Sequence, residues 1–403
     1  AICKVTGYIS GSKPNNLNQD FHHFVWNCTG QTANVDLGLT GGNTIHGNFE
    51  VDATGSVRVQ LTSPAAILTP ININGDIIVR GGQFSTNGSS SAATIIVNVL
   101  GNITVTGGNF SVSRGSAPDV TFNLYGDFTV SNATLQNSGA TRINKLIFSG
   151  NGTHNLSFSN VQYGTTGTGH FTMEVAAGST LNLGTSVITA SNTGSFIVAP
   201  GGTVATGHAD GLAGAIMCTG ASNGGGNSFS TEGNYAFKGS VAQVTSALMP
   251  TTVNNLVINN AAGVALTQPT TINGVLRLMA GVFNNTVPFT LGPSGSISFE
   301  GGSLLVTSVE NEGTIPQSFF VEQNYPNPFN PATAIRFGLP RESQVSIRVF
   351  NLIGQQVATV FEGKKQAGTH TLMFDATNLG SGVYIYRVQS GNLVQSRRMV
   401  LLK

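Results

Sequence analysis

Three segments in the first half of the chain repeat one pattern at a nearly constant spacing. They are Gly75–Val79, Gly101–Val105 and Gly126–Val130, and in each a glycine is followed by a polar residue and then by apolar residues at alternate positions. Alternation with period two places the apolar side chains on one face of a strand. The repeat of about 25 residues stacks such faces into one continuous core, so we predict an all-β, parallel, right-handed β-solenoid.

The repeat also predicts which side chains of successive coils stack upon one another. Core positions lie two, four and nine residues after each glycine, and polar residues between the core positions face outward in columns. The predicted core ladder is Ile77, Val79, Phe84, Ile103, Val105, Phe110, Phe128, Val130 and Leu135. The predicted outer columns are Asn72, Asn98 and Asn123, and Asp76, Asn102 and Asp127. Corners need a residue that tolerates positive φ, for which Gly81-Gly82, Gly107-Gly108 and Asn132 are suited.

Composition and spacing divide the chain into four parts. Only 9% of the 403 residues are charged and 52 are glycine, a combination typical of β structure with many turns. We expect residues 1–33 to cap the first coil and residues 34–306 to form roughly eleven coils. A hinge at 307–317 leads to short alternating strands at 318–403, which predict a small sandwich. The repeat is weakest at 207–233, where we expect a loop or a change of coil shape.

Charge and hydropathy exclude two classes of partner. The formal net charge is +1, which gives no electrostatic basis for binding nucleic acid. No apolar run approaches the roughly 20 residues of a membrane-spanning helix. We therefore expect neither nucleic-acid binding nor a membrane span.

The cysteines suggest a covalent link near the N-terminus. In a secreted protein, Cys3 and Cys28 would form a disulfide, leaving Cys218 as a buried or unpaired thiol. An alternative is a metal site formed by Cys3, Cys28 and the adjacent His22 and His23. This spacing fits no zinc pattern well, and adjacent residues of a strand point to opposite faces.

Solenoids can be polysaccharide lyases or hydrolases, but this chain lacks the expected pattern. Such enzymes need converging carboxylates on one wall, whereas the acidic residues here are few and scattered. Asp76 and Asp127 share a column with Asn102 between them, so a calcium site is the alternative to a polar ladder. Gly220–Gly224 matches the pattern Gly-x-Ser-x-Gly, but glycine-rich sequence replaces the helix that a nucleophile elbow requires. We predict no enzymatic activity and no cofactor.

The last part of the chain carries a series of short motifs. Its segments Glu322–Pro331, Val349–Gln355, Ala367–His370, Ser381–Val388 and Met399–Lys403 resemble, in order, the type A C-terminal sorting domain of cargo of the type IX (Por) secretion system. The resemblance implies an immunoglobulin-like sandwich that the outer-membrane translocon recognises, and a secreted or cell-surface protein of a Gram-negative bacterium. The residues that carry it are Tyr325, Pro326, Asn327, Pro328, Phe329, Asn330, Pro331, Gly354, Gly368, Gly382, Tyr384 and Lys403. Residues 234–291 are also similar to repetitive surface proteins exported by the same route.

These features favour a structural protein of the cell surface. We expect a stiff rod that self-associates into extracellular filaments or a sheath, with the sandwich as part of the contact between subunits. The first alternative is a monomeric adhesin that binds surface glycans, and the second is a β-helix polysaccharide lyase or hydrolase.

Overall fold

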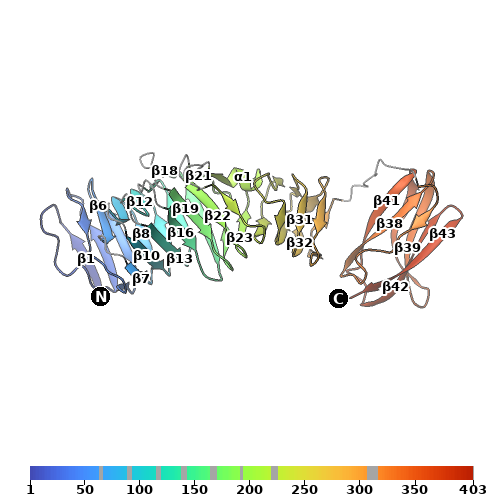
Figure 1. The fold of residues 1–403 in the computed structure, drawn as a ribbon, viewed down its shortest axis with the longest axis horizontal. Coiled ribbons are helices and arrows are strands. Elements are labelled where there is room, and N and C mark those ends of the chain that lie inside the picture. Colours follow the sequence, from blue (N-terminus) through green and yellow to red (C-terminus); the bar gives the residue numbers. More distant parts are fainter. Residues whose placement is uncertain are drawn as a thin grey trace.

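The structure, a computed structural model, has a long parallel part and a shorter antiparallel part (Figure 1). It describes residues 1–62, 67–88, 93–114, 119–137, 143–163, 170–190, 194–218, 226–305 and 316–402.

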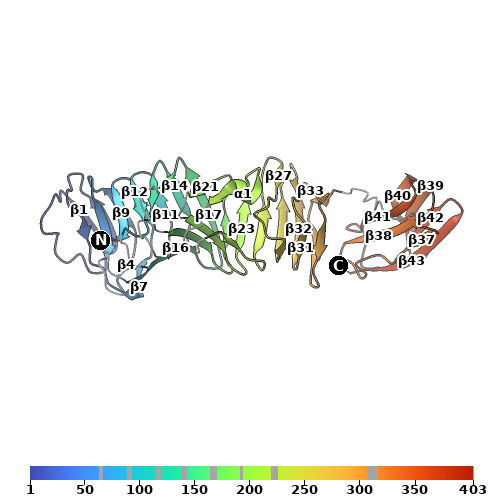
Figure 2. The same cartoon turned by 45° about the horizontal axis from the view of Figure 1, so that its top comes forward.

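The parallel part is built on one sheet of thirteen strands, and successive coils contribute one strand each. These strands lie side by side along the long axis of the molecule (Figures 1 and 2). Eleven of them, β5 to β35, fall within residues 34–306, in agreement with the predicted number of coils. In order along the sheet they are β1 (Ile2–Thr6), β2 (His23–Asn27), β5 (Phe49–Ala53), β8 (Ile77–Val79), β11 (Ile103–Val105), β14 (Phe128–Ser131), β17 (Thr153–Ser159), β20 (Thr180–Asn182), β23 (Thr203–Thr206), β26 (Asn234–Phe237), β29 (Asn255–Asn259), β32 (Val275–Ala280) and β35 (Ser296–Phe299).

Smaller parallel sheets form the other walls of the solenoid. An eight-stranded sheet contains β4 (Thr44–Ile45), β7 (Ile67–Ile73), β10 (Thr94–Val99), β13 (Asp119–Leu124), β16 (Ile143–Phe148), β19 (His170–Val175), β22 (Gly194–Val198) and β25 (Ser228–Phe229). A six-stranded sheet contains β3 (Val35–Asp36), β6 (Arg58–Thr62), β9 (Gln83–Asn87), β12 (Asn109–Ser111), β15 (Thr134–Gln136) and β18 (Gln162–Tyr163). Later coils use β27 (Gln243–Val244), β30 (Val264–Ala265), β33 (Val282–Asn284) and β36 (Ser303–Leu304), together with β28 (Thr252–Val253), β31 (Thr270–Ile272) and β34 (Phe289–Leu291).

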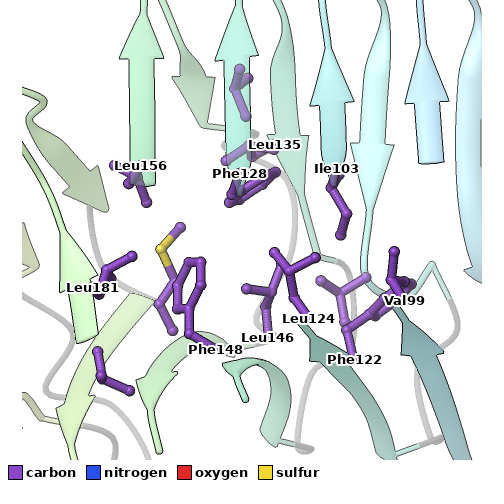
Figure 3. Packing of buried hydrophobic residues seen from close by; sticks show 14 of the residues in the cluster. Val99, Ile103, Phe122, Leu124, Phe128, Leu135, Leu146, Phe148, Leu156 and Leu181 are labelled. Carbon is purple, nitrogen blue, oxygen red and sulfur yellow. The ribbon is translucent and has the colours of Figure 1, made fainter. Parts of the chain in front are cut away.

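The core ladder has the predicted register. Val105 pairs with Val79 on one side and with Val130 on the other. All nine predicted ladder residues are at most 3% exposed. Figure 3 shows side chains from successive coils meeting in this core, and the rings of Phe84 and Phe110 stack with centroids 5.2 Å apart. Burial of a continuous apolar column therefore holds neighbouring coils together.

Both polar columns are also present on the outer wall. The Asn98 side-chain amide donates to Oδ1 of Asn72 at 3.0 Å, and Asn123 donates to Asn98 at 2.9 Å. In the second column the backbone N–H of Asn102 donates to Oδ1 of Asp76 at 2.7 Å, and that of Asp127 donates to Oδ1 of Asn102 at 2.8 Å. Each side chain of the second column thus satisfies a backbone donor of the next coil.

The repeated glycines are explained by close approach between coils as well as by backbone conformation. A Cβ on Gly101 would lie 2.4 Å from Oδ1 of Asp76 and 2.6 Å from the carbonyl carbon of Gly75. At the following corner Gly108 has φ = 69°, and Asn132 has φ = 49° in the next coil, as predicted.

The coil length changes in the second half of the solenoid. Val204 pairs with Tyr235, and the long coil between them contains α1 (Gly211–Ala215) and β24 (Ile216–Cys218), which pairs with β21 (Ile188–Ala190). The expected irregularity at 207–233 is therefore present. Beyond it Tyr235 pairs with Leu256 and Leu256 with Leu276, so the later coils approach the lower limit of solenoid repeats, about 20 residues.

The N-terminal segment extends the solenoid, and the predicted disulfide is wrong. Both β1 and β2 belong to the main sheet, where Cys3 pairs with Phe24. Cys28 lies four residues further along than Phe24, about 13 Å at 3.3 Å per residue, which is too far for a disulfide. Both thiols are free, and Sγ of Cys28 instead lies 3.7 Å from the carbonyl oxygen of Val5.

The C-terminal part is a two-layer antiparallel sandwich with its own core, as predicted. One layer contains β37 (Phe320–Val321), β38 (Ala332–Leu339) and β41 (Gly368–Asp375). The other contains β40 (Gln356–Lys365), β39 (Ser343–Asn351), β42 (Gly382–Ser390) and β43 (Leu393–Leu401). Within the described residues, no helix is long and apolar enough to cross a membrane.

Candidate functional site

The strongest candidate site lies at one end of the sandwich, where distant motifs meet. Asn351, the last residue of β39, pairs with Tyr384, and Gly382, the first residue of β42, pairs with Leu401 near the chain end. Strand pairing therefore gathers the second, fourth and last motifs at the same end of the four-stranded layer.

Residues Tyr325–Pro331 of the first motif are attached to this end through β43. The backbone N–H of Phe329 donates to the carbonyl of Val400 at 2.9 Å, and that of Leu402 donates to the carbonyl of Phe329 at 2.9 Å. The Phe329 ring is only 2% exposed and packs near Phe374. Oδ1 of Asn327 accepts a hydrogen bond from the N–H of Val400 at 2.8 Å. Phe329 is thus the anchor of the loop.

Buried polar groups fix the start of the same loop. The amide of Asn324 donates to Oγ1 of Thr333 at 2.9 Å, and that hydroxyl donates to the carbonyl of Pro326 at 2.8 Å. The sequence motifs did not predict that Thr333 belongs to the site, because Asn324, its hydrogen-bond partner, lies nine residues earlier across a loop. With both ends of the loop held, Tyr325 projects outward and is 77% exposed.

A tight turn adds two further exposed apolar side chains. The N–H of Gly354 donates to the carbonyl of Asn351 at 3.0 Å, and Gly354 has φ = 84°, which favours glycine. Leu352 and Ile353 at its tip are 68% and 86% exposed. Exposed apolar patches often mark contact surfaces, so we regard these side chains as candidates for contact with a partner.

The remaining motif residues have structural roles or lie elsewhere. Gly368 is at the opposite end of β38, paired with Leu339, and has φ = 142°. The hydroxyl of Tyr384 donates to the carbonyl of Gly380 at 2.8 Å. Pro326, Pro328 and Asn330 are exposed in the loop, and the carbonyl of Pro331 accepts from the N–H of Ala376 at 2.9 Å. Lys403 lies outside the described residues.

A buried tyrosine supports the start of the first motif. The hydroxyl of Tyr386 donates to the carbonyl of Glu322 at 2.6 Å, and its side chain is fully buried. Burial raises the pKa of Tyr386 to about 12, so the phenol stays protonated and keeps this hydrogen bond at physiological pH.

The solenoid offers weaker candidates for chemistry. Two of its carboxylates, those of Glu50 and Asp52, both bind Arg80, at 2.6 and 2.7 Å. Nδ1 of His208 lies 3.9 Å from Oδ2 of Asp210. The Gly220–Gly224 motif lies outside the described residues. Across the part of the chain that the structure describes, no group of three or more His, Cys, Asp or Glu side chains could hold a metal ion.

The fold and this site define a two-part all-β protein whose C-terminal sandwich presents exposed apolar side chains at one end. Residues 323–402 match the family model described as secretion system C-terminal sorting domain. The chain is therefore cargo of the type IX secretion system, and its destination is the cell surface or the extracellular space. Searches of curated proteins and of solved structures found no match to this chain.

Proposed function

We propose that this protein is a non-enzymatic structural rod of the cell surface, whose copies assemble end to end into extracellular filaments or a sheath. The observation that carries the proposal is the thirteen-stranded parallel sheet, whose outermost strands β1 and β35 each have one neighbour only among the described strands. An uncovered strand edge presents free N–H and C=O groups and recruits another chain. Low charge density along the rod weakens repulsion between copies.

Export is proposed to depend on the outer-membrane translocon as the partner of the sandwich. Tyr325, Leu352 and Ile353 form the exposed part of the sorting motifs and are suited to this contact. Because they lie on the sandwich, the solenoid remains available for its structural role after export.

A concentration series of the purified full-length protein tests the assembly. We expect light scattering to increase steeply with concentration, and negative-stain images to show filaments with a constant diameter. A protein that stays monomeric at high concentration, with residues 316–403 intact, would contradict the proposal.

A second candidate function rests on two exposed side chains of the solenoid wall. Leu100 and Tyr125, in successive coils, are 51% and 43% exposed. Exposed aromatic side chains are suited to contact with apolar faces of a ligand, so a monomeric adhesin that binds surface glycans is the alternative. Glycan-array binding that is lost in Tyr125→Ala, without assembly of the protein, would favour it.

A further inference from the structure

The last coil of the solenoid ends in apolar side chains that no described residue covers fully. Leu276 and Leu278 on β32 are fully buried, whereas their partners on β35, Ile297 and Phe299, are partly exposed. The same is true of Phe289, Leu291 and Leu304 on the neighbouring walls. This end therefore presents the cross-section of the core together with the open edge of β35.

The sandwich does not fill the space next to this end of the solenoid. A cavity of about 1000 Å³ lies between the last coil and the first sorting motif. Ile297, Phe299 and Leu304 line it on the solenoid side, and Tyr325 and Pro328 line it on the sandwich side. An apolar space of this size is suited to a further polypeptide segment.

The opposite end of the rod has a complementary edge. In β1 the side chains of Cys3 and Val5 face the core and are partly exposed, whereas Ile2, Lys4 and Thr6 are exposed on the outer face. The N–H of His23 donates to the carbonyl of Ala1. The N–H and C=O groups of successive residues in a strand point to opposite sides. Those of Cys3 and Val5 therefore face β2, as the carbonyl of Ala1 does, and those of Ile2 and Lys4 face the open edge.

The open edge of β35 has the matching arrangement. The N–H of Ser296 donates to the carbonyl of Gly274, and that of Glu300 donates to the carbonyl of Leu278, so these even-numbered residues face the solenoid. The backbone groups of Ile297 and Phe299 therefore face outward. Their side chains, by contrast, face the core, as those of Cys3 and Val5 do at the other end.

We infer that β1 of a second copy adds in parallel to β35, with Cys3 opposite Ile297 and Val5 opposite Phe299, and continues the main sheet from one molecule into the next. This inference rests on the proposed end-to-end assembly and names its contact. This register stacks core-facing side chains upon core-facing side chains, and it brings the free backbone groups of one edge opposite those of the other.

The charges at the two ends are compatible with this pairing. The register places Lys4 of the incoming copy beside Ser298, whose hydroxyl donates to Glu300 on the same face at 3.0 Å. Lys4 then approaches the Glu300 carboxylate, which also binds Arg277 at 2.8 Å. The contact therefore gains an opposite-charge pair between Lys4 and Glu300.

Disulfide trapping in the full-length protein tests the register. The variant Ile297→Cys, in a Cys218→Ser background, leaves Cys3 as the partly exposed native thiol, because Cys28 is fully buried. We expect mild oxidation under assembly conditions to give a ladder of covalent dimers and higher oligomers on a non-reducing gel.

Three matched proteins serve as controls for the trapping. Ser298→Cys in the same background points its thiol to the outer face and should give no ladder, and neither should Ile297→Cys combined with Cys3→Ser. The surface pair Lys4→Cys with Ser298→Cys, combined with Cys3→Ser, should restore the ladder without any change in the core. Ladders of equal strength in Ile297→Cys and Ser298→Cys, or none in either cysteine pair while filaments form, would overturn the inferred contact.

A backbone substitution separates this inference from the assembly itself. Lys4→Pro removes the N–H that faces the open edge of β1, whereas Lys4→Ala keeps it. We expect Lys4→Pro to abolish filaments while its melting temperature stays close to that of Lys4→Ala. Filaments that persist in Lys4→Pro would reject the β1–β35 contact but retain the proposed function, whereas a wild-type protein that never assembles would reject both.

Discussion

Val105 shows how strictly the core ladder constrains individual residues. Its side chain is fully buried between Val79 and Val130, while Thr104, one residue earlier, faces the outer wall. Val105→Asp should lower the free energy of unfolding by several kcal/mol, because it buries a carboxylate without a partner. Thr104→Asp should have little effect. Thermal unfolding followed by circular dichroism measures both, and equal damage from the two substitutions would contradict the register.

Gly101 tests the close approach between coils. Gly101→Ala places a methyl group against Asp76 and the backbone of Gly75, so we expect a loss of about 1–3 kcal/mol from overpacking. Gly152→Ala is the matched control, because a Cβ there has no atom within 4 Å. Unfolding midpoints that fall equally in the two variants would show that contact between coils at Gly101 is not responsible for the loss.

The sequence predicts side-chain direction in the solenoid well but predicts tertiary pairing of cysteines poorly. Alternation with period two was sufficient to place Val105 inside and Thr104 outside, because a strand offers only two faces. The erroneous Cys3–Cys28 disulfide has a different origin. Its formation depends on the register between β1 and β2, which spacing along the chain does not determine.

One coil is the natural unit of insertion and deletion in this fold. Removal of residues 76–101 joins Gly75 to Asn102 and brings Phe49 opposite Ile103, so every column continues. We expect the shortened protein to fold with an unchanged β-sheet spectrum, since each coil contacts only its neighbours. Removal of residues 76–88 alone deletes half a coil, so the strands that follow no longer stack on the matching strands of the preceding coil. This deletion should prevent cooperative unfolding. Folding of the half-coil deletion would argue against coil-by-coil stacking.

The strength of the sequence signal varied among elements. Coils near 75–130 carry glycine anchors and long apolar alternations, which predict their length and faces. After residue 234 the coils become shorter, and many strands of the smaller sheets span only two or three residues. Such short strands give no measurable period, so the change in coil length was not predicted.

The candidate site at the end of the sandwich was predicted only in part. Resemblance identified its motif residues, but their common location follows from antiparallel pairing of Asn351 with Tyr384 and of Gly382 with Leu401. Sequence position cannot indicate that pairing. Sequence position also did not show that Phe329 is a buried anchor whereas Tyr325, four residues earlier, is exposed.

At the scale of the whole molecule, the two parts have separate hydrophobic cores. Removal of residues 316–403 should therefore leave a folded solenoid that the native host retains in the periplasm, because the sorting sandwich is missing. Cell fractionation with an antibody against the solenoid measures its location. Surface exposure of the truncated protein would contradict the role of the sandwich in export.

The direction of the strands has a mechanical consequence. In the main sheet, hydrogen bonds between coils run along the rod, because the strands lie across its long axis (Figures 1 and 2). Tension applied to the two chain ends would therefore peel one coil at a time from the terminus, and would not load many bonds together in shear. Each coil of about 25 residues would release roughly 80–90 Å of extended chain. A rod built in this way would yield in small, repeated steps, and its unpeeled part would remain intact under load.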